Sequence, residues 1–263
     1  PQEDATLAEL IHEIAGDALP KEIPGLHAVH AVEAAGVHPL LLAIASDRYA
    51  PYEEHKPREL HTIGHALLGY GQLSLAKYLW LTARESDSMP DIRDVSAFFR
   101  HVLRRVSWER DLHFITRTTM DTLDYSGAGL NEGSKLLLAV SGSPRRTLAE
   151  EIPQALLKLW PDNWSAPKLV LPGVLTFSGS SSGGKGAEPE VLDEELEGFS
   201  RRLRESGQAE ELLNGFPLWV MADEPGFVAK SLRQRCVVSQ SQTDVESPVQ
   251  YGVLSSQLRV KMF

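Results

Sequence analysis

Two histidines, His61 and His65, have the spacing in this sequence that comes nearest to a metal site. They are four positions apart in a segment of helical patterning, residues 57–68, so both rings would lie on one helix face. The residues between them, Thr62-Ile63-Gly64, include no glutamate that could act as a general base. Two interpretations stay open: a metal-dependent hydrolase that uses the histidine-rich first quarter of the chain, or histidines with no shared function.

A second pattern, in residues 179–186, matches the glycines and the lysine of a phosphate-binding loop. The residue after Lys185 is Gly186, so the hydroxyl that would hold a magnesium ion is missing. Proline and glutamate follow at positions 188–190, where a helix would have to direct its N–H groups at phosphate. Composition alone explains the match, and we interpret residues 178–187 as a flexible Ser/Gly linker.

The remaining nucleophiles and carboxylates do not form a recognisable catalytic set. There is no GxSxG elbow, and the single cysteine, Cys236, has no histidine close to it in the sequence. Lys135 stands between a glycine turn and an apolar run, where its amine could reach a phosphate or could lie at the end of a strand. From the residues alone we predict neither catalytic residues nor metal ligands in this chain.

Composition excludes several classes of partner. The formal net charge of −10 repels nucleic-acid phosphates and anionic membrane surfaces, and no apolar run is long enough for a membrane span. One cysteine cannot form an intramolecular disulfide, which favours a reducing, cytoplasmic location. The sequence does not begin with methionine, so we expect it to be a piece of a longer protein.

The first part of the chain, residues 1–145, has the alternating pattern of an α/β domain. A continuous apolar run, Leu40-Leu41-Leu42-Ala43-Ile44-Ala45, is typical of a strand that is covered on both faces. Apolar residues at helical spacing predict a helix over residues 91–103. Further strands are predicted over residues 26–33, 77–83 and 111–116, and a helix over 57–68. We therefore expect a mixed, mainly parallel sheet flanked by helices in three layers.

Residues 146–263 have a different texture and are predicted to form a less regular extension. Helices are expected over 148–160 and 190–205, and an apolar stretch over 168–177 is interrupted by Pro172-Gly173. The segment Leu218-Trp219-Val220-Met221-Ala222 repeats the pattern of Leu79-Trp80-Leu81-Thr82-Ala83, which indicates a second strand-helix element.

The order of motifs in residues 5–140 resembles the C-terminal domain of UbiD-type decarboxylases. The matching segments are Ile23-Pro24-Gly25-Leu26-His27-Ala28-Val29-His30 with the strand after it, Asp47-Arg48-Tyr49, Gly71-Gln72-Leu73-Ser74-Leu75-Ala76-Lys77, the helix over 91–106, Met120-Asp121-Thr122-Leu123-Asp124-Tyr125, and Gly133-Ser134-Lys135-Leu136-Leu137-Leu138. Residues 216–232 resemble the tail of the longer, menaquinone-type members.

This resemblance implies reversible decarboxylation of an aromatic or unsaturated acid on prenylated FMN. A divalent metal such as manganese would bridge the cofactor phosphate to the protein. The catalytic carboxylates and metal ligands of such enzymes lie in a preceding split-barrel domain, which is then the first expected partner of this chain. We expect the present domain to close the cofactor pocket, with Tyr70, Met120, Leu123 and Lys135 as cofactor-binding residues.

The resemblance also implies a homo-oligomer, because UbiD-type enzymes assemble mostly through this domain. Five tryptophans agree with an interface, since aromatic side chains are enriched at interface hot spots, although they could equally be core residues. If the chain acts without catalysis, a pure oligomerisation or binding module is the remaining alternative.

Overall fold

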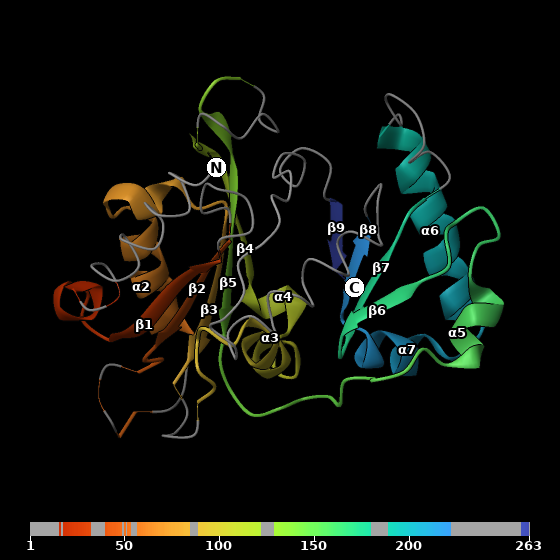
Figure 1. The fold of residues 1–263 in the computed structure, drawn as a ribbon, viewed down its shortest axis with the longest axis horizontal. Coiled ribbons are helices and arrows are strands. Elements are labelled where there is room, and N and C mark those ends of the chain that lie inside the picture. Colours follow the sequence, from red (N-terminus) through yellow and green to blue (C-terminus); the bar gives the residue numbers. More distant parts are fainter. Residues whose placement is uncertain are drawn as a thin grey trace, which may run out of the picture. The chain divides into compact units, whose positions relative to one another are not determined.

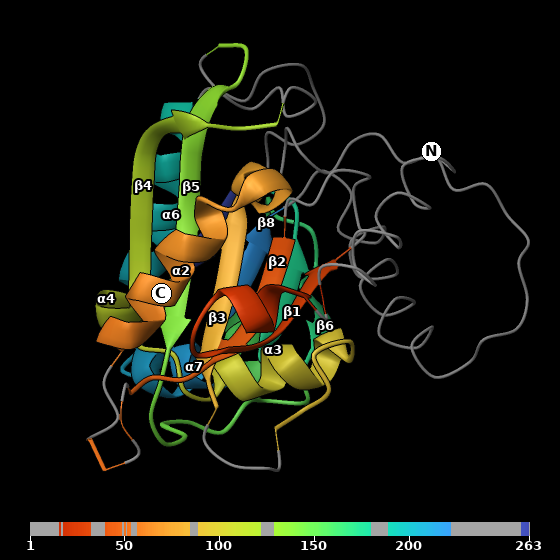
Figure 2. The same cartoon turned by 90° about the vertical axis from the view of Figure 1, so that its left-hand side faces the viewer.

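The computed structural model describes residues 16, 18–32, 40–48, 50, 52–53, 57–84, 89–121, 129–179, 189–221 and 259–262. Within these ranges the chain divides into two compact units, one up to Pro144 and the other from Arg145 onward. Each unit has its own sheet and is described by itself (Figures 1 and 2).

The first unit is built on a five-stranded mixed sheet in the order β1-β2-β3-β5-β4. Its strands are β1 (Leu26–Val32), β2 (Leu40–Ala45), β3 (Tyr78–Ala83), β4 (Leu112–Thr119) and β5 (Glu132–Val140). The three central strands, β2, β3 and β5, run parallel, while β1 and β4 are antiparallel edges. The central strands are almost fully buried, because side chains on both faces are covered.

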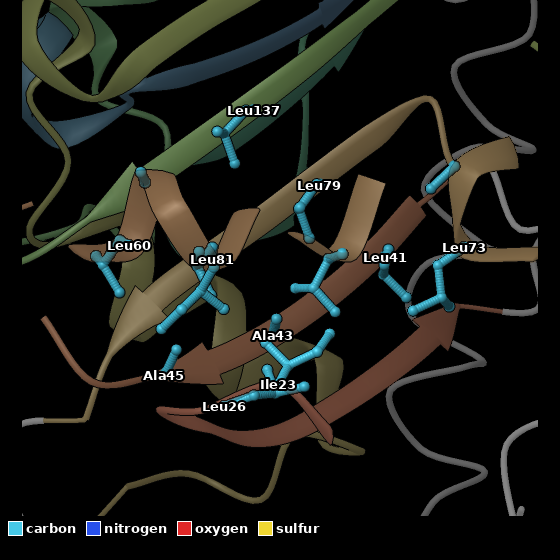
Figure 3. Close-up of a cluster of buried hydrophobic side chains, with 14 of the residues drawn as sticks. Ile23, Leu26, Leu41, Ala43, Ala45, Leu60, Leu73, Leu79, Leu81 and Leu137 are labelled. Carbon is cyan, nitrogen blue, oxygen red and sulfur yellow. The ribbon is translucent and has the colours of Figure 1, made fainter. Parts of the chain in front are cut away.

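Helices cover both faces of this sheet, which confirms the predicted α/β class (Figure 1). On one face, α2 (Arg58–Leu68) and the 3-10 helix η1 (Gly71–Leu75) pack on alternate strand residues, as Figure 3 shows for Leu60, Leu73, Leu79, Leu81 and Leu137. On the other face, α3 (Val95–Leu103) places Phe99 on Trp80, with ring centroids 4.4 Å apart. A short helix, α4 (Trp108–Asp111), leads into β4.

Local sequence signals explain where the two main helices of this unit begin. Pro57 is the N-cap residue of α2, and its missing N–H removes a group that the helix could not have paired. Asp94 caps α3: its Oδ1 accepts a hydrogen bond of 2.9 Å from the N–H of Ala97. The predicted apolar face of α3 is confirmed, since Val95, Phe98, Phe99, Val102 and Val106 are all buried.

The second unit contains a four-stranded sheet in the order β6-β7-β8-β9. The strands are β6 (Lys168–Leu171), β7 (Val174–Phe177), β8 (Leu218–Met221) and β9 (Arg259–Met262), and only β7 and β8 are parallel. The helices are α5 (Gln154–Leu159), α6 (Pro189–Glu205) and α7 (Ala209–Gly215). Trp160, Trp164, Phe177, Phe199 and Trp219 form its aromatic core.

Two boundaries differ from the sequence-based expectation. The helix expected over 148–160 begins only at Gln154, because Pro153 is extended (ψ 146°) and cannot continue a helix behind it. The interrupted apolar stretch 168–177 is a hairpin, in which Gly173 adopts the positive φ of +79° that the tight turn requires. The strand predicted at Leu218 is confirmed, and the helix expected after it lies outside the described residues.

No helix in the part of the chain that the structure describes is both long and apolar enough to cross a membrane.

Candidate functional site

Lys135 is the central residue of the candidate site, at the amino end of the parallel strands. It lies on β5, its side chain is 3% exposed, and its Nζ donates hydrogen bonds to the backbone oxygens of Ser74 (2.5 Å) and Ala76 (2.8 Å). Burial lowers the pKa of the Lys135 amine below its usual range. Because Ser74 lies in η1 and Ala76 is the residue that ends it, Lys135 holds the end of η1 against the start of the sheet.

The side chain of Met120 packs on β5 at Gly133, two residues before Lys135 on the same strand. Met120 follows β4, is 2% exposed, and its N–H donates to the oxygen of Asn131 at 3.1 Å. Its side chain covers the backbone of Gly133 so closely that a Cβ at position 133 would lie 1.6 Å from the Met120 Sδ. Since Gly133 and Lys135 are two residues apart on one strand, they share a face of the sheet.

Tyr70 completes the described part of the predicted set. It precedes η1, is 39% exposed, and its hydroxyl donates a hydrogen bond to the carboxylate of Glu22. This hydrogen bond, more than burial, raises the pKa of the Tyr70 hydroxyl. Tyr70 is the residue that precedes η1, and Lys135 donates to Ser74 within η1, so this helix connects the two residues. The fourth predicted residue, Leu123, lies outside the described residues.

His61 and His65, whose spacing could suit a metal site, do not contact each other as two metal ligands would. The Nδ1 of His65 donates to the backbone oxygen of His61 at 2.7 Å, one turn back along α2. The ring of His61 instead meets that of His113 on β4, with centroids 4.1 Å apart and planes at 65°. The Nε2 atoms of His61 and His113 are buried and have no hydrogen-bond partner. Among the described residues, no three His, Cys, Asp or Glu side chains gather as metal ligands.

Close packing between α2 and β5 explains why position 64, between the two histidines, is a glycine and not a larger residue such as glutamate. A Cβ at this position would lie 2.9 Å from Cδ1 of Leu137, so the glycine lets α2 approach β5 closely. The sequence between His61 and His65 is thus explained by helix–sheet packing.

We expect the first unit to lose stability as the pH falls from 7.5 to 5.5, in part because of His61. Burial first, and then the neighbouring His113, lower the pKa of His61 below 6.5. The unfolded chain therefore binds this proton at a higher pH than the folded chain does, so stability is lost on acidification through about pH 6.5. Urea unfolding at both pH values should show a smaller loss for His61→Gln than for the unsubstituted chain. His65→Gln removes only one of the smaller contributions to this pKa, after burial and His113, so it should change the pH dependence less than His61→Gln does. An unchanged pH dependence in His61→Gln would contradict the assignment.

Sequence reasoning missed an ion pair beside these histidines. The carboxylate of Asp111, at the end of α4, is fully buried and accepts from Nε (2.5 Å) and Nη2 (3.0 Å) of Arg110. It also accepts from the N–H of Ser107 at 2.8 Å, and Arg110 Nη2 donates to the oxygen of Ser141 at 2.9 Å. The hydrogen bond to Asp111 raises the pKa of the Arg110 guanidinium. An Arg-Asp dipeptide is a weak signal in a sequence, and its partner Ser141 is 31 residues away.

Comparison with known families gives a match over the first part of this chain. Residues 5–140 match the domain described as the 3-octaprenyl-4-hydroxybenzoate carboxy-lyase C-terminal domain, UbiD_C. These residues make up slightly more than half of the chain and lie within the sequence of the first unit.

Curated relatives share this region and are much longer. An uncharacterized protein of Chlamydia trachomatis is 36% identical over 147 residues, which are 56% of this chain and 24% of the relative. A Chlamydia pneumoniae protein, named as one of the subunits of a 4-hydroxybenzoate decarboxylase, is 34% identical over 147 residues, 56% of this chain and 23% of its own length. The aligned region thus spans about a quarter of the length of these relatives.

Similar solved structures include a decarboxylase and a UbiD-class enzyme, both at low identity. The vanillic acid decarboxylase of Sedimentibacter hydroxybenzoicus in its open form aligns with a TM-score of 0.40 and 16% identity, over 55% of this chain and 30% of that one. A UbiD-class enzyme of Pelotomaculum thermopropionicum, in complex with FMN, aligns with a TM-score of 0.37 and 13% identity, over 56% and 31%.

Proposed function

Because residues 5–140 match the domain that ends UbiD carboxy-lyases, the chain belongs to this family, and we propose that it closes the cofactor and substrate pocket of such an enzyme. We also propose that it carries the assembly of the oligomer. The reaction of the whole enzyme would be removal of a carboxyl group from an aromatic or unsaturated acid. The observation that carries this proposal is the match over residues 5–140. The relative named for 4-hydroxybenzoate decarboxylation supports an aromatic substrate.

The cofactor proposed for the whole enzyme is prenylated FMN with a divalent metal such as manganese, which together would accept the electron pair left by the departing carboxyl group. The described residues fit a wall of such a site better than a phosphate cradle. Tyr70 offers a partly exposed ring and Met120 an apolar side chain that is buried behind the surface at Gly133, whereas the Lys135 amine already has two carbonyl acceptors. We propose that Tyr70 and Met120 border the cofactor and that Lys135 acts by holding η1 in place. Leu123 stays a candidate of the same kind.

We expect the chain alone to release no CO₂ from 4-hydroxybenzoate when it is supplied with prenylated FMN and manganese. A fold does not bring chemistry without the reacting groups, and the proposal assigns these to a split-barrel domain. The same assay on the whole enzyme should give CO₂, and Met120→Ala there should change the ratio of kcat/KM between two aromatic acids. Turnover by the chain alone would overturn the proposal. An unchanged ratio together with a lowered Tm would show that Met120 serves packing only.

Self-association is proposed on the edge strand β4. Three of the five tryptophans, Trp80, Trp164 and Trp219, are buried in the cores of their own units, which supports the alternative that they are core residues. An exposed aromatic residue lies on this strand: Phe114 is 67% exposed on β4, the last strand in the order of the first sheet. An edge strand with an exposed apolar side chain can pair with a second copy of itself.

We expect the chain to form a dimer that tightens as salt is added. The net charge of −10 on each copy opposes association, and salt screens this repulsion. Sedimentation equilibrium at low and moderate ionic strength, at tens of micromolar protein, measures both states, and Phe114→Asp should shift the equilibrium toward monomer. A monomer at both salt concentrations would mean that assembly does not reside in this chain.

A further inference from the structure

The second unit has a surface hollow that the family match does not cover. Its volume is about 410 Å³, within the range of small-molecule sites. It lies on the side of α6 that faces the segment after α5, and its lining includes Asn163, Trp164, Glu195, Gly198, Arg201 and Arg202.

One wall of the hollow is fixed by a hydrogen-bonded carboxylate. Glu195 Oε2 accepts from the indole Nε1 of Trp164 at 3.0 Å, and Oε1 accepts from Nδ2 of Asn163 at 3.1 Å. Trp164 is itself held in the aromatic core, stacked on Phe177 with ring centroids 4.7 Å apart. Glu195 is therefore a pre-positioned acceptor, because each carboxylate oxygen can accept more than one hydrogen bond.

The floor of the hollow is open because residue 198 is glycine. A Cβ there would meet no atom within 4 Å outside the helix's own backbone, so packing within this unit does not require the glycine. A glycine in a helix interior weakens the helix relative to alanine. The missing side chain instead leaves space three residues, or about one helical turn, beyond Glu195.

The far end of the hollow carries two cations. Arg201 and Arg202 are exposed, and no carboxylate among the described residues pairs with Arg201. The guanidinium of Arg202 lies 5.8 Å from the ring centroid of Phe199, which holds its stem along the helix. The side chains that line the hollow thus include two cations and one anion, so the lining itself favours an anionic group at its arginine end.

We propose that this hollow binds a small organic carboxylate that carries a hydrogen-bond donor at its other end. The acid group would pair with Arg201 and Arg202, whose fork-shaped guanidinium groups suit carboxylates. The donor would reach Glu195 across the open surface of Gly198. Glu195 repels ligands that are anionic at both ends, so the site selects against dicarboxylates, and a compact anion such as phosphate gains nothing from Glu195. This site is independent of the decarboxylase proposal, because every residue in it lies beyond residue 140.

Isothermal titration calorimetry on the full chain tests the site with matched probes. The ligand is 4-(aminomethyl)benzoate, which has an acid and an ammonium donor, and the comparison compounds are 4-methylbenzoate and inorganic phosphate. We expect Arg201→Gln to weaken binding of the first probe roughly tenfold, since a charge-assisted hydrogen bond is lost. Gly198→Leu should abolish binding by filling the floor, while its better helix propensity keeps the chain folded. Arg204→Gln, which removes an equal charge from the same helix outside the lining, is the matched control.

The outcomes separate a built site from general charge attraction. Binding of 4-(aminomethyl)benzoate that is tighter than that of 4-methylbenzoate, and that is lost in Gly198→Leu but kept in Arg204→Gln, supports the proposal. Absence of binding by the first probe overturns it. Equal binding of phosphate, or equal weakening in Arg204→Gln and Arg201→Gln, also overturns it, because either result means attraction to α6 as a whole.

Discussion

Replacing Arg110 by methionine should lower the free energy of unfolding of the first unit by about 1–3 kcal/mol, the usual cost of leaving a buried acceptor without its partner, because Asp111 is fully buried while the Arg110 side chain is 42% exposed. The carboxylate of Asp111 is fully buried, and Arg110 supplies two of its hydrogen bonds. Without Arg110, the hydrogen bond from the N–H of Ser107 would remain to the carboxylate of Asp111 among the contacts described above. The oxygen of Ser141 would also lose the hydrogen bond from Nη2. Urea unfolding at pH 7.5 measures the change.

A double-mutant cycle shows whether the loss of stability comes from the buried Asp111 carboxylate that no longer has its charged partner. Asp111→Asn removes the charge that Arg110→Met leaves behind, so the double variant should lose less stability than the two single variants together, by at least about 1 kcal/mol. Arg104→Met makes the same chemical change at an exposed arginine on the neighbouring turn and should stay within about 0.5 kcal/mol. Additive effects in the cycle would mean that the pair is not coupled in solution.

The strands and the core of the first unit could be predicted because their signals are local. The apolar run Leu40–Ala45 has no polar position, as is typical of a strand covered on both faces, and it forms β2 between β1 and β3. The periodicity before Val106 likewise predicted the buried face of α3. The helix boundary at Gln154 was missed because apolar spacing was given more weight than the backbone restriction of Pro153.

The contacts of the candidate site could not be predicted in the same way, because they join distant positions. His61 meets His113, 52 residues later, and the acceptors of Lys135 are about 60 residues before it. No spacing rule relates such positions. The residue types at the site came from the family resemblance, and only the fold shows that Lys135 is held by two backbone carbonyls.

Substituting Gly133 by alanine should destabilise the first unit by about 1–3 kcal/mol, the usual range for overpacking. The new Cβ would lie 1.6 Å from Sδ of Met120, so the buried methionine side chain has to leave its position. Met120→Ala alone should cost about 2–5 kcal/mol by opening a cavity.

In the double variant Met120→Ala/Gly133→Ala, the two changes should compensate each other. The alanine methyl at 133 would occupy part of the space that the Met120 sulfur leaves, so the double variant should be more stable than the sum of the single effects by at least about 1 kcal/mol. Ser134→Ala, at the exposed neighbour on the opposite face of β5, is the control and should change stability by less than about 0.5 kcal/mol. Additive losses would show that the Met120 side chain does not rest on Gly133. Compensation in stability combined with a changed substrate ratio in the whole enzyme would show that one buried methionine both packs the β4–β5 end of the sheet and borders the reacting acid.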